Sequence, residues 1–147
     1  MSGMSYLALD FGEKRIGAAK SDELNFMAHA LGVIERDKNA TEFERIRVIC
    51  QENQVQTIVV GLPRTMKGEI GTKAQETLSF CEELRQRLNY EVVTWDERLT
   101  TVEAERKLLS HDVSRAKRRE KRDALAAEIL LQSYLDYLKM KGEEKHE

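Results

Sequence analysis

Acidic residues stand at the ends of predicted secondary-structure elements in three separate parts of this sequence. Asp10 lies near the end of the first apolar run, Asp96 and Glu97 end the last one, and Asp123 opens the final helical pattern. Carboxylates that meet repel one another and raise one another's pKa values, and a divalent cation removes that repulsion. Oxygen ligands without His or Cys suit Mg²⁺ or Mn²⁺ rather than zinc. The pattern therefore predicts a site for one or two Mg²⁺ or Mn²⁺ ions.

A site of this kind can hydrolyse a phosphodiester bond. Two ions about 4 Å apart activate a water molecule and stabilise the leaving oxygen. We therefore take Asp10, Asp96, Glu97 and Asp123 as candidate catalytic residues, with Asp10 bridging the ions if there are two. Each acid also has a purely structural explanation. Asp10 could form an Asx turn, Asp123 could favour the start of its helix, and the Asp96–Glu97 pair could end a solvated loop.

Hydrophobic periodicity and capping signals predict the elements that must position these acids. Strands are expected over 5–11, 15–20, 31–36, 55–63 and 90–95, and helices over 72–88, 100–109 and 119–141 and from a capping box at Thr41 and Glu44. This order implies an α/β fold with a mixed sheet, antiparallel at one side, and helices on both faces. Ligands of such sheets gather beyond the carboxyl ends of the strands, so Asp10 and the Asp96–Glu97 pair are expected to share that edge.

Side-chain periodicity predicts which faces are buried. In the first strand, Asp10 shares a face with Tyr6 and Ala8, opposite Leu7, Leu9 and Phe11. In the last helix, Asp123 falls on a stripe with Ala126, Ala127, Leu130, Tyr134 and Leu138, so it is expected to point towards the sheet. The helix over 72–88 has a stripe of Ala74, Leu78, Cys81, Leu84 and Leu88. The last helix also carries Leu135 and Tyr137, which belong either to the core or to a dimer contact.

A basic segment directly precedes Asp123. The run SRAKRREKR contains Arg115, Lys117, Arg118, Arg119, Lys121 and Arg122, opposed only by Glu120. Such residues supply sequence-independent contacts to phosphates, although the run could also be a solvated helix start. No aromatic residues are interleaved with the run, so base stacking is not indicated there. Arg15 and Arg98 flank Asp10 and Asp96, where each could be an ion-pair partner or a phosphate clamp.

Length and composition predict one domain over 1–141 and a frayed tail over 142–147. No apolar run is long enough for a membrane helix and no signal peptide is recognised, so we expect a cytoplasmic protein. Cys50 and Cys81 are not a CxxC pair and are expected to be reduced structural thiols. We expect a monomer or weak homodimer.

Four segments, in this order, carry a family resemblance: LALDFGEKRIGAAKSD, TIVVGLPRTMKGEIG, VVTWDERLTTVEAE and SRAKRREKRDALAAEILLQSYLD. They resemble the YqgF/RuvX family of bacterial RNase H-like nucleases, which are related to Holliday-junction resolvases. The resemblance covers nearly the whole chain. The combination of D-x-G-x-x-R-I-G with D-E-R-x-T-T is specific, whereas either motif alone is weak.

The resemblance implies an RNase H-like, five-stranded mixed sheet with strand order 3-2-1-4-5, the second strand antiparallel, and an acidic cluster that binds metal. It also implies a nuclease that processes the 5′ end of pre-16S ribosomal RNA. The family's acids correspond to Asp10, the Asp96–Glu97 pair and Asp123, with Glu97 taken as the ligand of the pair and Asp96 as the alternative. Neighbouring strand residues face opposite ways, so only one of the pair is expected to point inward.

The loop after Gly-Leu-Pro departs from the family's pattern. Thr65 and Lys67 stand where an Asn and an acidic or amide residue are expected, and Thr72 and Lys73 stand where Pro-Arg is usual. These departures leave the acidic cluster intact. They question the part that the loop plays in substrate binding.

Three candidate functions are suggested by these features, and the length of the chain disfavours the third. The first is a Mg²⁺- or Mn²⁺-dependent phosphodiesterase acting on structured RNA or branched DNA. The second is a non-catalytic RNA-binding factor of ribosome assembly, which would need no metal. The third, an ATPase of the actin and sugar-kinase type, needs two such domains around a nucleotide, and this chain supplies one.

Overall fold

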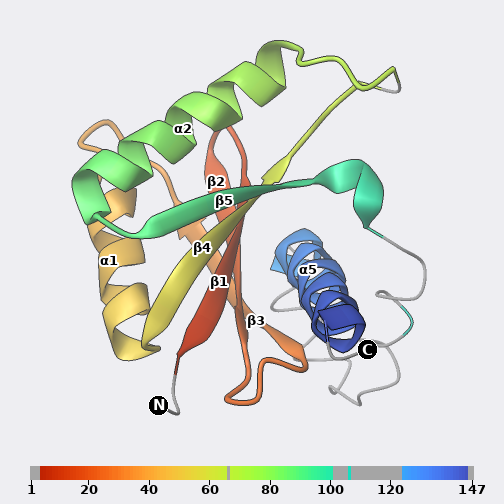
Figure 1. Cartoon of the computed structure of the whole chain (residues 1–147). Helices are drawn as coiled ribbons and strands as arrows, with labels where there is room; N and C mark the ends of the chain where they lie inside the picture. The colour runs from red at the N-terminus through yellow and green to blue at the C-terminus, as the bar shows by residue number, and fades with distance from the viewer. Residues whose placement is uncertain (1–3, 66, 101–105, 107–123, 146–147) are drawn as a thin grey trace.

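A five-stranded mixed sheet forms the centre of the molecule (Figure 1). The computed structural model describes residues 4–65, 67–100, 106 and 124–145. Its elements are β1 (Ser5–Phe11), β2 (Arg15–Ser21), β3 (Ala28–Glu35), α1 (Glu42–Glu52), β4 (Val55–Leu62), α2 (Thr72–Leu88), β5 (Glu91–Asp96), the 3₁₀ turn η1 (Glu97–Leu99) and α5 (Leu125–Lys145). The strand order is β3-β2-β1-β4-β5, which confirms the predicted fold class.

The strand directions bring the predicted acids to one edge of the sheet. β1 is antiparallel to β2 and parallel to β4, and β4 is parallel to β5. The carboxyl ends of β1, β4 and β5 therefore meet. Asp10 is the last residue but one of β1, Asp96 ends β5, and Leu62 pairs with Asp96 across β4 and β5. The two acidic segments lie on either side of the end of β4.

Two apolar cores cover the two faces of the sheet, as the alternation of β1 predicts. Leu7 and Leu9 belong to the core beneath α1 and α2, whereas Ala8 belongs to the core beneath α5. Figure 1 shows α1 and α2 on one side of the sheet and α5 on the other. Asp10 alternates with Leu9 and so faces α5.

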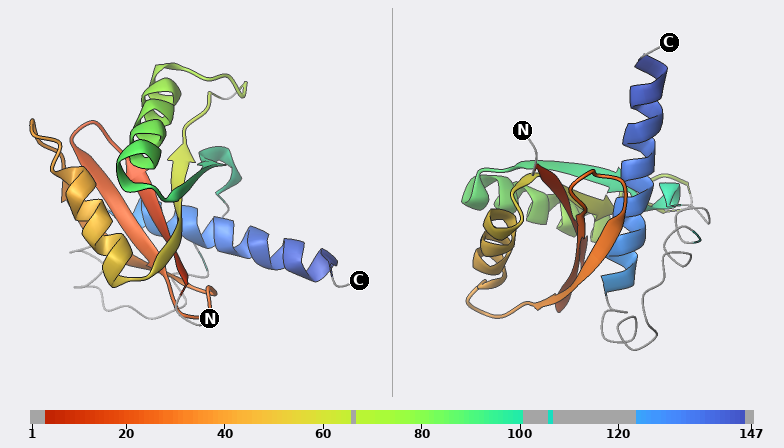
Figure 2. Two further views of the ribbon diagram at one scale, coloured as in Figure 1. Left: turned by 60° about the vertical axis from the view of Figure 1, so that its left-hand side comes forward. Right: turned by 90° about the horizontal axis from the view of Figure 1, so that it is seen from below.

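The last helix packs across β1, β2 and β3, and its C-terminal part projects beyond the sheet (Figures 1 and 2). Ala127 and Leu130 are buried as predicted, but Ala126 is exposed and Leu131 and Leu135 complete the buried stripe. Apolar residues surround much of this helix, so their periodicity left its rotation poorly defined. Leu135 therefore belongs to the core. The helix continues to Lys145, beyond the predicted end at residue 141.

Gln132 connects α5 to the outer strand. Its fully buried side chain accepts a hydrogen bond from the Ala28 backbone N–H and donates to the Phe26 carbonyl. Glu128 accepts a hydrogen bond from the Ala30 N–H. An edge strand exposes alternate N–H groups, and these two side chains satisfy them. The contacts also explain why β3 begins at Ala28 rather than at the predicted residue 31.

Three local predictions need correction or refinement. The Thr41 side chain makes no helix cap; its hydroxyl donates to Asp37, and buried Glu42 pairs with Arg36 at 3.2 Å instead. The capping box predicted with Glu44 is therefore wrong. In α2, whose bounds match the prediction, Leu78 is 40% exposed, and Thr77 and Phe80 are buried in its place. Strand β4 ends at Leu62, one residue before the predicted end, and β5 ends at Asp96, one residue after the predicted end.

The two cysteines are buried, free thiols in separate helices, as predicted. Burial raises the pKa of Cys50 to about 12 and that of Cys81 to about 11. Such thiols are inert packing groups. Among the described residues, no helix combines the length and apolar character needed to cross a lipid bilayer.

Candidate active site

Asp10 and Glu97 meet at the carboxyl edge of the sheet, on the face covered by α5. Both side chains are partly buried. Asp10 reaches this position because β1 continues past it to Phe11, and its partner on β2 is Gly17, which has no side chain to compete for the space. Glu97 reaches it because β5 ends at Asp96 and the chain turns into η1. The predicted convergence of these two acids is therefore present in the fold.

The electrostatics of this pair show how closely its members interact. Burial raises the pKa of Asp10, and a hydrogen bond from Glu97 partly lowers it again. Burial also raises the pKa of Glu97, and the negative charge of Asp10 raises it further. Both pKa values are therefore raised, chiefly by burial, the response expected of two carboxyl groups brought together out of water.

Gly61 provides the space for the Glu97 carboxylate. A Cβ atom on Gly61 would lie 2.8 Å from Oε1 of Glu97 and 3.2 Å from a methyl carbon of Leu130. Glu97 is thus packed over the backbone of β4, where Leu130 of helix α5 also approaches. Any larger residue at position 61 would displace the carboxylate, so the glycine is part of the site.

Asp96 points away from this pair and binds arginines instead. Its carboxylate accepts hydrogen bonds from Nη2 of Arg98 at 2.7 Å and from Nε at 3.1 Å, and Nε of Arg64 lies 3.9 Å away. The hydrogen bonds from Arg98 hold the pKa of Asp96 below its usual value. Of the two adjacent acids, Glu97 is therefore the one that faces Asp10, and Asp96 organises the rim.

The loop between β4 and α2 is closed by Thr65 and packs against Arg98. The Thr65 hydroxyl accepts a hydrogen bond from the Glu69 N–H at 3.0 Å, and its carbonyl accepts one from the Gly68 N–H at 2.8 Å. Gly68 has a positive φ of 83°, and a Cβ there would lie 3.2 Å from Nη1 of Arg98. Thr65 therefore bonds to the far side of the loop, at Gly68 and Glu69, beside Arg98.

Lys73 is a neighbour of the site to which the sequence analysis gave no role. It lies in the first turn of α2, and its positive charge lowers the pKa of Glu97, against the larger effects of burial and Asp10. The family pattern had drawn attention to this position only as a departure from Pro-Arg. A cation remains there, and its charge reaches the acidic pair.

The remaining predicted residues are elsewhere or outside the described residues. Arg15 makes an exposed ion pair with Glu35 at 3.5 Å. Asp123 and the basic residues Arg115, Lys117, Arg118, Arg119, Lys121 and Arg122 lie outside the described residues. Within the described part of the chain, no three His, Cys, Asp or Glu side chains gather closely enough to hold a metal ion. The described part of the predicted cluster is thus the two-carboxylate pair.

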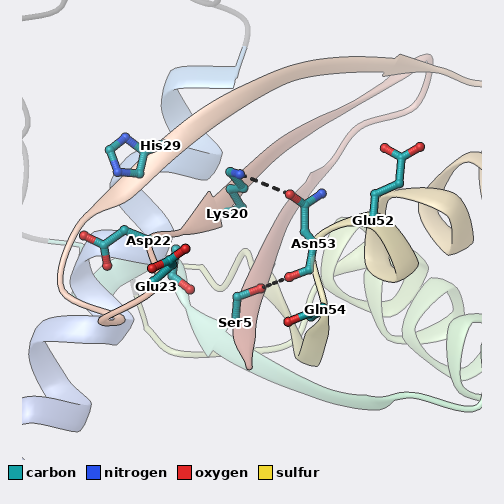
Figure 3. A pocket seen from close by; sticks show the side chains of 9 residues that line it. Ser5, Lys20, Asp22, Glu23, His29, Glu52, Asn53 and Gln54 are labelled. Carbon is teal, nitrogen blue, oxygen red and sulfur yellow. Dashed lines mark hydrogen bonds between the residues drawn. The ribbon is translucent and has the colours of Figure 1, made fainter. Parts of the chain in front are cut away.

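A polar pocket lies at the opposite end of β1 (Figure 3). Its volume is about 480 Å³, and Ser5, Lys20, His29 and Asn53 are among its lining residues. Lys20 donates a hydrogen bond to the Asn53 side chain, and the Ser5 hydroxyl donates to the Asn53 carbonyl. None of the predicted site residues that the structure describes lines this pocket, and Asp10 lies at the other end of β1.

Comparison with protein families agrees with the acidic motifs. The family model described as RuvX, Holliday junction resolvase, matches residues 4–137. The chain belongs to the RuvX family. Among curated RuvX relatives, a protein of Clostridium botulinum (strain Hall) named "Putative pre-16S rRNA nuclease" is 45% identical over 135 residues, covering 92% of this chain and 98% of that protein. One of the same name from Thermoanaerobacter pseudethanolicus is 46% identical over 139 residues, covering 94% and 100%.

Solved structures share the RuvX fold at low sequence identity. RuvC of T. thermophilus in complex with a Holliday junction substrate superposes with a TM-score of 0.64 at 14% identity, covering 94% of this chain and 96% of that one. The fowlpox virus resolvase in complex with Holliday junction DNA gives 0.57 at 13% identity, covering 92% and 99%. At this identity the likeness establishes an RNase H-like architecture.

Proposed function

We propose that this RuvX-family protein is a Mg²⁺- or Mn²⁺-dependent nuclease that processes the 5′ end of pre-16S ribosomal RNA in the cytoplasm. The observation that carries the proposal is the Asp10–Glu97 pair. Two partly buried carboxyl groups with raised pKa values are joined by a hydrogen bond at the carboxyl edge of an RNase H-like sheet. The names of relatives at 45% and 46% identity supply the substrate.

The chemistry of the pair suits a hard divalent cation. Both groups offer only oxygen atoms, and their raised pKa values show that burial disfavours the charged carboxylates, an effect that a bound cation offsets. Asp10 and Glu97, together with Asp123 from the segment before α5, would hold the ion. Once bound, a Mg²⁺ or Mn²⁺ ion supplies an activated water molecule and neutralises charge on the phosphate.

The chain's own residues bind and orient the nucleic acid. Asp96 holds Arg98 and Arg64 at the rim, so that two guanidinium groups stand beside the acidic pair. Guanidinium groups bind phosphate oxygens in fixed geometry. The basic residues 115–122 add sequence-independent affinity for the backbone, and Lys73 adds positive charge next to Glu97. Each of these groups acts on the substrate's phosphates.

A second candidate, resolution of branched DNA, is favoured by the family description and by the likeness to RuvC and the fowlpox resolvase. The sheet, the acidic edge and the arginine rim are equally compatible with both substrates. Discrimination between RNA and branched DNA must therefore come from the geometry of the substrate, which the cleavage assay compares directly.

The test uses the purified chain with two substrates. A ribosomal RNA precursor and a four-way DNA junction are each incubated with Mg²⁺, Mn²⁺ or EDTA, and Asp10→Asn serves as the matched variant. We expect product from the RNA only, only with metal, and none with Asp10→Asn. Cleavage of the junction alone would support the resolvase. Binding without product under every condition would instead identify a non-catalytic assembly factor.

A further inference from the structure

An aromatic cluster joins the end of β5 to helix α5. The Trp95 ring lies 5.0 Å from the ring of Tyr137 and 5.3 Å from that of Tyr134. Tyr134 is partly buried and in turn contacts Tyr6, so the inner part of the cluster belongs to the core. Tyr137 is different, because 42% of it is exposed. The cluster therefore presents an aromatic surface to solvent.

Hydrogen bonds hold this surface in a fixed position relative to the site. The Trp95 indole N–H donates to the Ser133 hydroxyl at 3.2 Å, and that hydroxyl donates to the Leu99 carbonyl at 2.9 Å. Ser133 is buried, so it ties β5, η1 and α5 together. Because these bonds already fix the surface, a ligand does not have to order the rings on binding, and the entropic cost of binding is lower.

The surface lies next to the acidic pair. Trp95 is partly buried and packs against the core beneath α5, the face on which Asp10 and Glu97 meet. Trp95 bonds to Ser133 of α5, and Glu97 lies with Leu130, about one helical turn earlier, over Gly61, so Trp95 is close to Glu97. A nucleic-acid strand with a phosphate at the acidic pair therefore brings a neighbouring nucleotide to Trp95.

Positive charge accompanies the aromatic rings. Nζ of Lys141 lies 5.8 Å from the centre of the Tyr137 ring. An exposed aromatic face with a cation at its border suits a flat, electron-rich ring attached to a phosphate. A hydrophobic protein partner would not require the Lys141 ammonium group. The adjoining acidic pair, moreover, is proposed to act on nucleic acid.

We infer that Trp95 and Tyr137 form a stacking platform for an unpaired nucleobase of the substrate, next to the scissile phosphate. The inference rests on the proposed function and deepens it, because it assigns a single-stranded segment to the substrate at this point. Stacking tolerates any base sequence, so the platform reads the unpaired state rather than the identity of the base.

The experiment uses the fluorescence of Trp95, the only tryptophan of the chain. The protein is titrated in EDTA with a single-stranded oligoribonucleotide of about 12 nucleotides, and in parallel with the same strand in a duplex. We expect the single strand to quench Trp95 emission and the duplex to quench it far less. Tyr137→Ala should weaken single-strand binding roughly 5- to 150-fold, whereas Tyr137→Phe, which keeps the ring, should bind like the wild type.

The matched control is Leu78→Ala on α2, across the sheet from the platform, where 40% of the side chain is exposed. It should leave the affinity unchanged. The inference is overturned if Tyr137→Ala binds like the wild type, if the duplex quenches as strongly as the single strand, or if Tyr137→Ala only converts a dimer to a monomer in sedimentation. If the single strand quenches Trp95 emission but no substrate is cleaved in the metal assay, the proposed nuclease function is rejected and the stacking platform is retained. Cleavage with wild-type KM by Tyr137→Ala would reject the platform alone.

Discussion

The carboxylate of Glu97 occupies the space that a side chain on Gly61 would fill. Oε1 of Glu97 would lie 2.8 Å from a Cβ atom built on Gly61, and real atoms do not approach that closely. The sheet therefore admits the acidic pair only because β4 has a glycine at its carboxyl end.

Gly61→Ala should impair activity with little loss of stability. The atom nearest the new methyl group is the end of a flexible side chain, so the carboxylate can move aside. That movement takes Glu97 away from Asp10, and we expect cleavage to fall about 10- to 100-fold, the range for groups that position metal ligands. Urea denaturation should show a change of less than about 1 kcal/mol. Full activity in Gly61→Ala would show that the position of Glu97 does not matter.

The two adjacent acids should respond differently to neutralisation. Glu97 faces Asp10, whereas Asp96 accepts hydrogen bonds from Arg98. We expect Glu97→Gln to lower the cleavage rate by about 100-fold or more, and Asp96→Asn by less than about 10-fold with a raised KM. The measurement is steady-state cleavage with each variant. The reverse order would mean that Asp96 is the essential acid.

Local sequence patterns predicted the fold well. The alternation of Leu7 and Leu9 with Asp10 placed the carboxylate on the correct face of β1, and the apolar periodicity after Gly71 gave the bounds of α2. These features depend on neighbours in the chain, which a sequence displays directly. They were sufficient to predict that Asp10 and the Asp96–Glu97 pair share an edge.

Features that depend on contacts between distant segments were harder to predict. Strand alternation could not select between Asp96 and Glu97, because β5 ends between them and η1 redirects the chain. The apolar residues of α5 left its rotation ambiguous, so Ala126 was wrongly taken as buried. Trp95 and Tyr137 meet only because α5 crosses the sheet. No spacing along the chain indicates such a contact.

The pH dependence of stability should show that the acidic pair is strained without metal. Burial raises the pKa of Asp10 above its ordinary value of 3.8. A raised pKa favours folding while the group is protonated, and this contribution is lost as the pH rises from 3.8 through the folded-state pKa. Asn is neutral at every pH. In EDTA, Asp10→Asn should therefore gain stability relative to the wild type across this window, and gain further as Glu97 titrates, because the Asp10 charge also raises the pKa of Glu97.

Urea denaturation at a series of pH values measures that difference. Mg²⁺ or Mn²⁺ should then stabilise the wild type above the window and leave Asp10→Asn nearly unchanged, because only the wild type gains a ligand that binds the folded state. A difference that does not vary with pH would mean that Asp10 titrates normally. An equal response of both proteins to metal would mean that Asp10 is not a ligand.

Gln132→Leu should destabilise the protein through the edge of the sheet. The buried amide of Gln132 satisfies the Ala28 N–H and the Phe26 carbonyl, and leucine of similar size would leave both without this partner. The Ala28 N–H is buried, and leaving it unsatisfied costs about 1–3 kcal/mol, so we expect a loss of that size in urea denaturation. The variant Gln132→Glu keeps an acceptor for the Ala28 N–H but places its carboxyl group against the Phe26 carbonyl and the Asp136 carboxylate, so its stability should fall as the pH rises and the buried group ionises. Hydrogen exchange gives the local readout: the Ala28 amide should lose protection in Gln132→Leu more than amides of β4 do, because β4 lies on the other side of β1 from the affected strand. Equal loss of protection throughout the sheet would mean that the Gln132–Ala28 hydrogen bond does not stabilise the edge strand β3 in particular. Helix α5 would then be held on the sheet by its apolar stripe alone.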